Sequence, residues 1–222
     1  MTVRTFVDRV DAGRQLAAAL GHTLAPGTLV LGLPRGGVPV AAEVAAALRL
    51  PLDVLCVRKL GMPRQPELAM GAVASGGAVV RNDDVLARVP DAEAALARVL
   101  ERERAELERR ERVYRGDAPP LAVRDRDVLV VDDGLATGAT MGAAVAALRA
   151  LGVRSLRVAV PVGSPEAVER LSTLADDVVC LLAPSTFGAV GSFYERFGQT
   201  TDAEVAALLA AARDATAGDA DE

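Results

Sequence analysis

The stretch DVLVVDDGLATGAT, residues 127–140, contains two adjacent acids followed by a turn of small residues. Such a turn can point backbone N–H groups at an anion, and a helix that follows it adds the positive end of its dipole. Asp132 and Asp133 would repel that anion, so they require hydroxyl donors or a metal ion as partners. A sugar phosphate offers a phosphate, neighbouring hydroxyls and a bound cation. The stretch therefore predicts a sugar-phosphate site; the simpler alternative is a strand, turn and helix with an acidic cap.

Two other segments could bring polar groups to the same edge of a sheet. PRGG follows the apolar run 28–33, and RKLG follows the apolar run 52–58. Ligands of open α/β sheets bind beyond the carboxyl ends of the strands, where all three segments would lie. Lys59 is the single lysine of the chain, which indicates either a place that needs a compact ammonium or a chance surface lysine. The sequence has no GxxxxGK[ST] motif, which excludes a nucleoside-triphosphate P-loop.

Strands and helices alternate along the chain that carries these segments. Apolar runs predict strands at 28–33, 52–58, 127–132, 154–162 and 177–183, and helical periodicity predicts helices at 7–20, 38–48, 91–113, 140–151, 165–172 and 201–214. We interpret 59–71, which is rich in Pro and Gly, as a mobile loop, and the segments around Gly76 and Gly77 as a hairpin. Unbroken apolar strands that alternate with helices predict an α/β fold, a parallel twisted sheet covered by helices on both faces.

The overall composition narrows the class of protein. The net charge is −5 and 51% of the residues are hydrophobic, so the chain can bury a full core but lacks the basic field of a nucleic-acid or membrane-surface protein. The sequence shows neither a signal peptide nor a membrane-spanning run, and Cys56 and Cys180 lie in apolar runs. We therefore expect a cytoplasmic protein with reduced thiols. His22, the only histidine, is interpreted as a helix-end or loop residue.

VLVVDDGLATGAT resembles the signature of the type I phosphoribosyltransferases. LPRGGVPVA resembles the pyrophosphate-binding loop of that family, and VRKLGMP resembles the entry to its flexible loop, most closely in adenine phosphoribosyltransferases. The similarity spans roughly residues 28–160 and extends to a bacterial group without an assigned acceptor. It implies the family fold with a small variable hood: one domain over 1–212, a core of about 28–183, a hood formed by the termini and by 91–115, and a disordered acidic tail over 213–222.

The resemblance assigns roles to individual residues. Asp132 and Asp133 would hold the ribose 2′ and 3′ hydroxyls of phosphoribosyl pyrophosphate (PRPP). The 5′-phosphate would bind the amides and threonine hydroxyls of the turn Gly134, Leu135, Ala136, Thr137, Gly138, Ala139 and Thr140. The pyrophosphate would bind Arg35, Gly36, Gly37, Arg58 and Lys59, in a loop where the family often has a cis peptide that does not involve the nitrogen of proline. The implied cofactor is Mg²⁺, which would enter with PRPP and water and could touch Asp132 and Asp133.

The implied activity is transfer of a phosphoribosyl group to a small-molecule nitrogenous acceptor with release of pyrophosphate. Arg35, Lys59, Asp132 and Asp133 are the residues expected to act in catalysis. The alternative is a non-catalytic regulatory protein that binds PRPP or a nucleotide; the presence of Lys59 and of a full-length loop favours the enzyme. Family habit and the apolar stripe on 91–113 predict a homodimer.

The acceptor is less well defined by the sequence. Ala136 replaces the aspartate that 6-oxopurine enzymes usually carry, which argues against hypoxanthine and guanine. Adenine enzymes carry a glutamate near their flexible loop, and Glu67 is the carboxylate nearest to that position. Phe187, Phe193 and Tyr194 could stack on an acceptor ring, and packing in the core of a terminal element is the alternative.

Overall fold

The structure, a computed structural model, describes residues 5–21, 23–63 and 65–218. His22 lies outside the described residues, and the side chains of residues 66, 67 and 216–218 lie outside the description as well. Within the described residues, the main body contains a parallel sheet in the order β2-β1-β6-β7-β8, which confirms the predicted fold class. Its strands are β1 (Leu29–Gly32), β2 (Leu52–Val54), β6 (Asp127–Val131), β7 (Ser155–Val162) and β8 (Asp177–Leu182).

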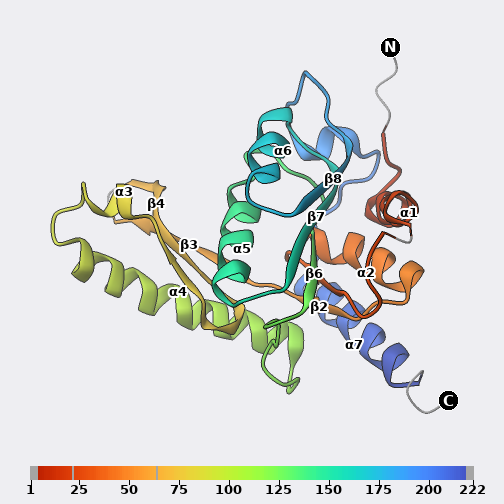
Figure 1. The fold of residues 1–222 in the computed structure, drawn as a ribbon, viewed down its shortest axis with the longest axis horizontal. Helices are drawn as coiled ribbons and strands as arrows, with labels where there is room; N and C mark the ends of the chain where they lie inside the picture. Colours follow the sequence, from red (N-terminus) through yellow and green to blue (C-terminus); the bar gives the residue numbers. More distant parts are fainter. Residues whose placement is uncertain (1–4, 22, 64, 219–222) are drawn as a thin grey trace.

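Helices cover both faces of this sheet, as Figure 1 shows. The first face is covered by α1 (Arg9–Leu20) and α2 (Gly37–Leu48), and the second by α5 (Ala139–Ala150) and α6 (Pro165–Ser172). Along β6, Leu129 packs toward α1 and α2 while Val130 packs toward α5 and α6, and both are fully buried. Because successive strand residues point to opposite faces, a strand between two helical layers must be apolar throughout.

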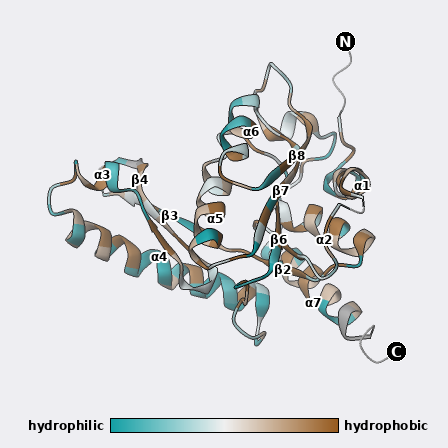
Figure 2. Ribbon diagram, in the orientation of Figure 1, coloured by the Kyte–Doolittle hydropathy of each residue, from teal (hydrophilic) through white to brown (hydrophobic). Residues whose placement is uncertain are grey.

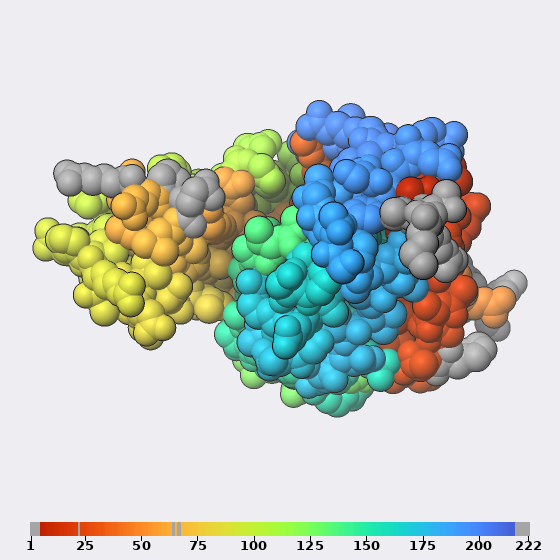
Figure 3. Space-filling model, turned by 90° about the horizontal axis from the view of Figure 1, so that it is seen from above, coloured from red at the N-terminus to blue at the C-terminus, as the bar shows by residue number. Residues whose placement is uncertain are grey.

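A second, antiparallel sheet and a long helix project from this body and form what we call the arm (Figures 1 and 3). The arm consists of β3 (Val57–Met62), β4 (Gln65–Ala74), a short 3-10 helix (Ser75–Gly77), β5 (Val79–Arg81), α3 (Asp83–Leu86) and α4 (Ala92–Arg115). The β4–β5 connection confirms the hairpin predicted around Gly76 and Gly77. This small sheet is a hood added to the parallel core.

The prediction of one strand over residues 52–58 is wrong. The chain forms β2 in the main sheet, leaves that sheet, and then forms β3 in the arm. Both halves are apolar because both are covered, so composition alone could not reveal the change of sheet. The consequence for the site is that Lys59 belongs to the arm and not to the main body.

The prediction of a mobile loop over residues 59–71 is also wrong, because these residues form most of the β3–β4 hairpin. The Pro and Gly residues that suggested a loop have local roles in this hairpin. Pro63 lies in its turn. A side chain on Gly71 would meet the carbonyl oxygen of Val80 at 2.2 Å, so glycine lets β5 approach β4.

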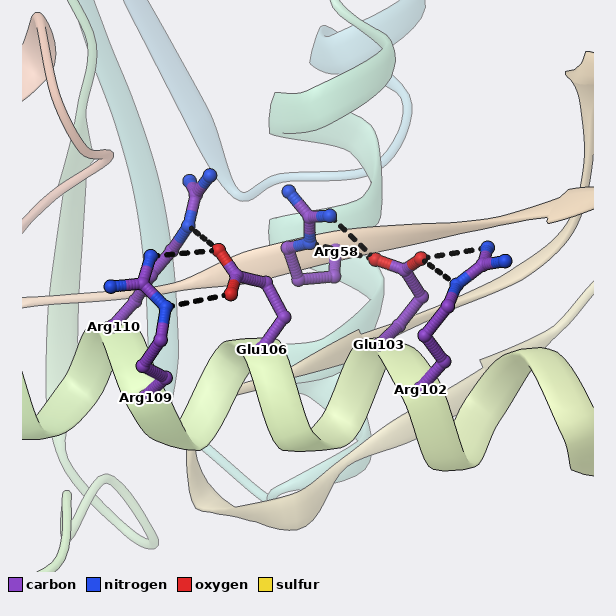
Figure 4. Close-up of polar contacts among 6 residues, drawn as sticks. All are labelled: Arg58, Arg102, Glu103, Glu106, Arg109 and Arg110. Atoms are coloured by element: carbon purple, nitrogen blue, oxygen red, sulfur yellow. Dashed lines mark hydrogen bonds and ion pairs between the residues drawn. The ribbon is translucent and has the colours of Figure 1, made fainter.

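The predicted helix 91–113 is confirmed as α4, and Figure 2 shows its apolar and polar residues alternating along its length. The buried members of its predicted stripe are Leu96, Leu107 and Tyr114. On its polar side, Glu106 pairs with Arg109 at 2.8 Å and with Arg110 at 2.9 Å (Figure 4). The acids thus neutralise arginines of the same helix, as expected for a solvated helix face.

The C-terminal part begins with a short 3-10 helix, Val190–Phe193, and ends with α7 (Asp202–Gly218), which packs against α2 and α4. The domain boundary expected at residue 212 falls inside α7, so residues 213–218 are helical and not part of a disordered tail. The last residues of the expected tail, 219–222, lie outside the described residues.

Both cysteines are free thiols, with Cys56 buried and Cys180 half-buried. Burial raises the pKa of Cys56 to about 12 and that of Cys180 to about 11, so neither thiol ionises at neutral pH. Over the part of the chain that is described, no helix combines the length and the apolar character needed to cross a bilayer.

Candidate active site

The PRGG loop and the acids that follow β6 lie in direct contact. Leu33 donates its N–H to the carbonyl oxygen of Val131 at 2.9 Å, which aligns the two strand ends. A Cβ on Gly36 would lie 2.0 Å from Asp133 Oδ2, and a Cβ on Gly37 would lie 2.7 Å from the Val131 oxygen. A larger residue at Gly37 would push the two loops apart, and one at Gly36 would displace the Asp133 carboxylate or the loop. The glycine pair therefore sets the distance between two predicted parts of the site.

Arg35 extends from this loop toward the C-terminal helix. The peptide bond between Pro34 and Arg35 is cis, as the family resemblance implies. The Arg35 side chain is 39% exposed and its Nη1 lies 3.8 Å from Asp202 Oδ1. The same carboxylate oxygen accepts a hydrogen bond of 2.8 Å from the Tyr114 hydroxyl. Asp202 and Tyr114 connect the PRGG loop to α7 and α4. Sequence reasoning did not single out Asp202 and placed Tyr114 only in the apolar stripe of the long helix.

Asp132 and Asp133 are half-buried at the end of β6. Burial raises the pKa of Asp132 well above its ordinary value, and the charge of Asp133 raises it further. A hydrogen bond of 2.9 Å from the Asp133 N–H to Asp132 Oδ1 acts in the opposite direction. Burial also raises the pKa of Asp133, although the guanidinium of Arg9 opposes this. Neighbouring acids with raised pKa values are unfavourable for folding and typical of functional sites.

Arg9, the first residue of α1, neutralises Asp133 and is the main site residue that sequence reasoning missed. Its Nε and Nη2 atoms both lie 2.8 Å from Asp133 Oδ2. Its Nη1 donates to the carbonyl oxygen of Gly198 at 2.7 Å, and its guanidinium carbon lies 4.0 Å from the centre of the Phe197 ring. No local motif marks this arginine, because only tertiary packing brings α1 to the end of β6.

The C-terminal aromatic residues pack beside this ion pair. The Tyr194 hydroxyl donates to the backbone oxygen of Asp133 at 2.6 Å and its ring contacts Phe6, while Phe193 stacks on Phe187 with ring centres 5.4 Å apart. Phe193 and Tyr194 are only 5% and 6% exposed. Their rings therefore belong to the core, in agreement with the packing alternative and not with stacking on an acceptor. Acceptor contact by the half-buried Phe187 stays a prediction.

The turn after the two acids leads into α5 as predicted. Gly138 precedes the helix with φ of 65°, a conformation that favours glycine. Thr137 and Thr140 are exposed beside the first helical turn, whose N–H groups have no acceptors inside the helix. Leu135 differs, because its side chain is buried and its N–H donates to the oxygen of Val162 at 2.9 Å. The Leu135 amide would have to leave Val162 to contact a phosphate, so its predicted contact stays a prediction, as do those of the turn residues after it.

Lys59 lies on β3 at a cleft of about 710 Å³ between the arm and α5. Thr137 and Thr140 of the predicted phosphate turn line the same cleft, and Asn82 and Asp84 line it from the arm. Lys59 is exposed. The fold thus places side chains from two distant segments of the sequence around one space.

Arg58, which precedes Lys59 on β3, is engaged with α4. Its Nε lies 2.9 Å and its Nη2 2.6 Å from Glu103 Oε2, and Glu103 also pairs with Arg102 at 2.9 Å (Figure 4). The Glu103 side chain is 10% exposed, so this group is largely shielded from water. The predicted contact of Arg58 with pyrophosphate would require it to leave Glu103. In this structure its role is to connect β3 to α4.

Two acids, two glycines and a helix N-terminus meet at the carboxyl edge of the parallel sheet of this α/β domain, the edge at which open α/β sheets bind their ligands. The family model for the phosphoribosyl transferase domain matches residues 10–196, and the chain belongs to that family.

The chain is 48% identical over 207 residues to Rv0571c of Mycobacterium tuberculosis (strain ATCC 25618 / H37Rv), which is provisionally named a phosphoribosyl transferase. This similarity covers 93% of the chain and 47% of the relative, so the chain spans about half the length of that protein. Over 64 residues, 29% of the chain and 31% of the relative, it is 41% identical to a uracil phosphoribosyltransferase of Exiguobacterium sp. (strain ATCC BAA-1283 / AT1b).

Among solved structures, the crystal structure of TT1426 from Thermus thermophilus is 49% identical to this chain. The match has a TM-score of 0.84 and covers 93% of this chain and 98% of that chain. The main sheet, the helices on its two faces and the arm therefore belong to a fold that a relative shares over nearly its whole length.

Proposed function

We propose that this domain transfers the 5-phosphoribosyl group of PRPP to a nitrogenous acceptor and releases pyrophosphate. The observations that carry the proposal are two juxtapositions of predicted site segments that lie far apart in the sequence. Gly36 of the PRGG loop approaches Asp133, and Lys59 shares a cleft with Thr140. Membership of the phosphoribosyl transferase family supports the same reaction.

In the proposed reaction, the bond between the anomeric carbon and a pyrophosphate oxygen breaks, and a bond from the acceptor nitrogen to that carbon forms. The electron pair of the broken bond leaves with pyrophosphate, and the acceptor nitrogen releases a proton. Negative charge grows on the leaving group, where Arg35 and Lys59 would stabilise it. Asp132 and Asp133 would accept hydrogen bonds from the ribose hydroxyls and so hold the anomeric carbon in place.

Magnesium fits this site as a companion of the substrate and not as a metal held by protein ligands alone. Among the residues that the structure describes, no three His, Cys, Asp or Glu side chains gather into a metal site. Asp132 and Asp133 are oxygen donors of the kind that Mg²⁺ prefers, and Mg²⁺ usually keeps water and substrate phosphates as its other ligands. When bound, it would neutralise charge on the pyrophosphate.

The acceptor that we propose is a base other than a common 6-oxopurine. Ala136 is exposed where the 6-oxopurine enzymes usually carry an aspartate, so no carboxylate at this position can exchange a proton with the base. The 64-residue similarity to a uracil phosphoribosyltransferase supports the same conclusion, because uracil is a pyrimidine. The Glu67 side chain lies outside the description, and its predicted role as a counterpart of the adenine-enzyme glutamate stays a prediction.

A screen of nitrogenous bases with PRPP and Mg²⁺, with pyrophosphate release as the readout, tests the proposal. We expect release with at least one base outside the 6-oxopurines, and loss of that release in the Lys59→Ala protein. Tight PRPP binding without release for any base would favour the regulatory alternative. Failure to bind PRPP at all would overturn both.

A further inference from the structure

Arg9 connects three parts of the molecule at Asp133. It begins α1, which is capped by a hydrogen bond of 3.0 Å from the Asp11 N–H to Asp8 Oδ1. The Arg9 and Asp133 side chains are only 13% and 15% exposed, so water screens their ion pair weakly. The same guanidinium binds the Gly198 carbonyl oxygen and stacks on an aromatic ring. A planar guanidinium can make all of these contacts at once, and an ammonium cannot.

The contacts of the Asp133 carboxylate with Arg9 and Gly36 are concentrated on one of its two oxygens. The hydrogen bond from Arg9 Nε and the ion pair from its Nη2 both end on Oδ2, and the close approach of Gly36 is also to Oδ2. Neither contact of the Arg9 guanidinium with this carboxylate involves Oδ1, which lies outside the ion pair. A half-buried carboxylate oxygen in that position is suited to accept a hydrogen bond from a ligand. Arg9 thus contacts Oδ2 and leaves Oδ1 on the side of the carboxylate away from the ion pair.

The backbone of Asp133 is fixed from the other side. The Tyr194 hydroxyl donates to its carbonyl oxygen at 2.6 Å, and its own N–H donates to Asp132 Oδ1 at 2.9 Å. Tyr194 belongs to the same segment as Phe197 and Gly198, which hold Arg9. One C-terminal segment therefore restrains both the main chain of Asp133 and the partner of its side chain.

We propose that Arg9 is a positioning residue for ribose recognition: it holds Oδ2 of Asp133 so that Oδ1 is presented to a ribose hydroxyl of PRPP. The inference rests on the proposed function, because it takes a ribose hydroxyl as the ligand of Asp133. A purely structural ion pair would have a different consequence, since its loss would lower the affinity for all ligands of the site alike. A loss that depends on the ligand hydroxyls is therefore the diagnostic result.

Calorimetry on the full chain with two probes separates these cases. Ribose 5-phosphate carries both hydroxyls, and 2,3-dideoxyribose 5-phosphate keeps the phosphate and lacks both. We expect Arg9→Gln to weaken ribose 5-phosphate binding about ten-fold and dideoxyribose 5-phosphate binding by less than about two-fold. Arg9→Lys should give an intermediate preference, because it keeps the charge without the two-pronged contact. Arg14→Gln, on the same helix, 70% exposed and paired with Glu43, is the matched control and should change neither affinity.

Equal losses for the two probes, or an Arg9→Gln protein that keeps the wild-type preference, would overturn the role of Arg9 and leave the proposed function intact. Wild-type protein that binds both probes equally well would overturn both proposals. If Arg9→Gln fails to fold, as judged by its thermal melt, Arg9→Lys decides the question. The Arg9→Lys protein must then show a smaller preference for ribose 5-phosphate over dideoxyribose 5-phosphate, with a melting temperature close to that of the wild type.

Discussion

The ribose end and the leaving-group end of the proposed site are built differently. At the ribose end, Asp133 and Arg9 lie in close contact on the main body, against Gly36 of the predicted pyrophosphate loop, and the ion pair is almost shielded from water. At the leaving-group end, Lys59 is exposed on the arm and faces Thr140 across a cleft of about 710 Å³. The first end is packed before any ligand arrives, whereas the second leaves room for one.

We infer from this difference that the two ends contribute separately to the reaction. A preorganised ribose site binds with a small loss of conformational entropy, because its side chains are already held in place. A site open between two parts of the molecule can admit the substrate and then close to exclude water. Changes at the ribose end should therefore affect binding, and changes at Lys59 should affect turnover.

Gly36→Ala should reduce ligand binding at the ribose end more than any other change proposed for the site. The new Cβ would lie 2.0 Å from Asp133 Oδ2, so either the carboxylate must move away from Arg9 or the two loops must separate. We expect ribose 5-phosphate affinity to fall about 100-fold and the free energy of unfolding to fall by about 1–3 kcal/mol. Calorimetry and urea denaturation measure the two effects. Gly188→Ala, where a Cβ would meet nothing within 4 Å, is the control, and wild-type affinity in Gly36→Ala would show that this contact is not part of the site.

Asp132→Asn should separate binding from stability. The native pKa of Asp132 is raised above its unfolded value, so the native state binds its proton more tightly. The stabilising contribution of this proton is complete below a pH of about 4 and is lost as the pH rises through the native pKa. At pH 7 the ionised acid then destabilises the fold, and Asn should raise the free energy of unfolding.

The same variant should bind ribose 5-phosphate about ten-fold more weakly, because an amide replaces a charged acceptor. Urea denaturation at pH 4 and pH 7 checks the stability, with the difference between variant and wild type expected to shrink at the lower pH. A variant less stable than the wild type at pH 7 would contradict the expected burial of an unfavourable charge.

Lys59→Ala tests the leaving-group end. Turnover should fall about 100-fold, because the ammonium would stabilise charge that develops only as pyrophosphate leaves. Ribose 5-phosphate has no pyrophosphate, so its affinity should change by less than about two-fold. Steady-state kinetics and calorimetry compare the two quantities. Arg104→Ala removes a positive charge from an exposed position of α4 and should change neither. Equal losses of turnover and of ribose 5-phosphate binding would remove Lys59 from the pyrophosphate side.

Glu103→Gln should have the smallest effect on ligand binding. It tests whether the arm can be destabilised without a change in the main body. It weakens the pairs with Arg58 and Arg102 that connect β3 to α4, at an expected cost of about 1 kcal/mol. Amide hydrogen exchange should become faster in β3 and α4 and stay unchanged in β6. Ribose 5-phosphate affinity should stay within two-fold of the wild type. Unchanged exchange in the arm would mean that these ion pairs do not stabilise it.

Local patterns in the sequence were sufficient for the main sheet and for the segments at its edge. Apolar runs bounded by turns predicted the strands from β6 to β8 within one or two residues, because a strand covered on both faces must be apolar throughout. The DDGLATGAT turn and the PRGG loop could be recognised because their residue types follow from backbone geometry, with Gly138 in a left-handed conformation and Gly36 against a carboxylate.

Only the tertiary structure decided which of these residues meet and which partners they have. The run 52–58 divides between two sheets, and Arg58 and Lys59 thereby belong to the arm, where Glu103 of a distant helix engages Arg58. Arg9 reaches Asp133 across 124 positions of sequence. Such contacts leave no local pattern, because they depend on how layers pack and on which groups then lose their water. The sequence determined what the strand ends could bind, and packing determined the charge and orientation of the groups that would bind it.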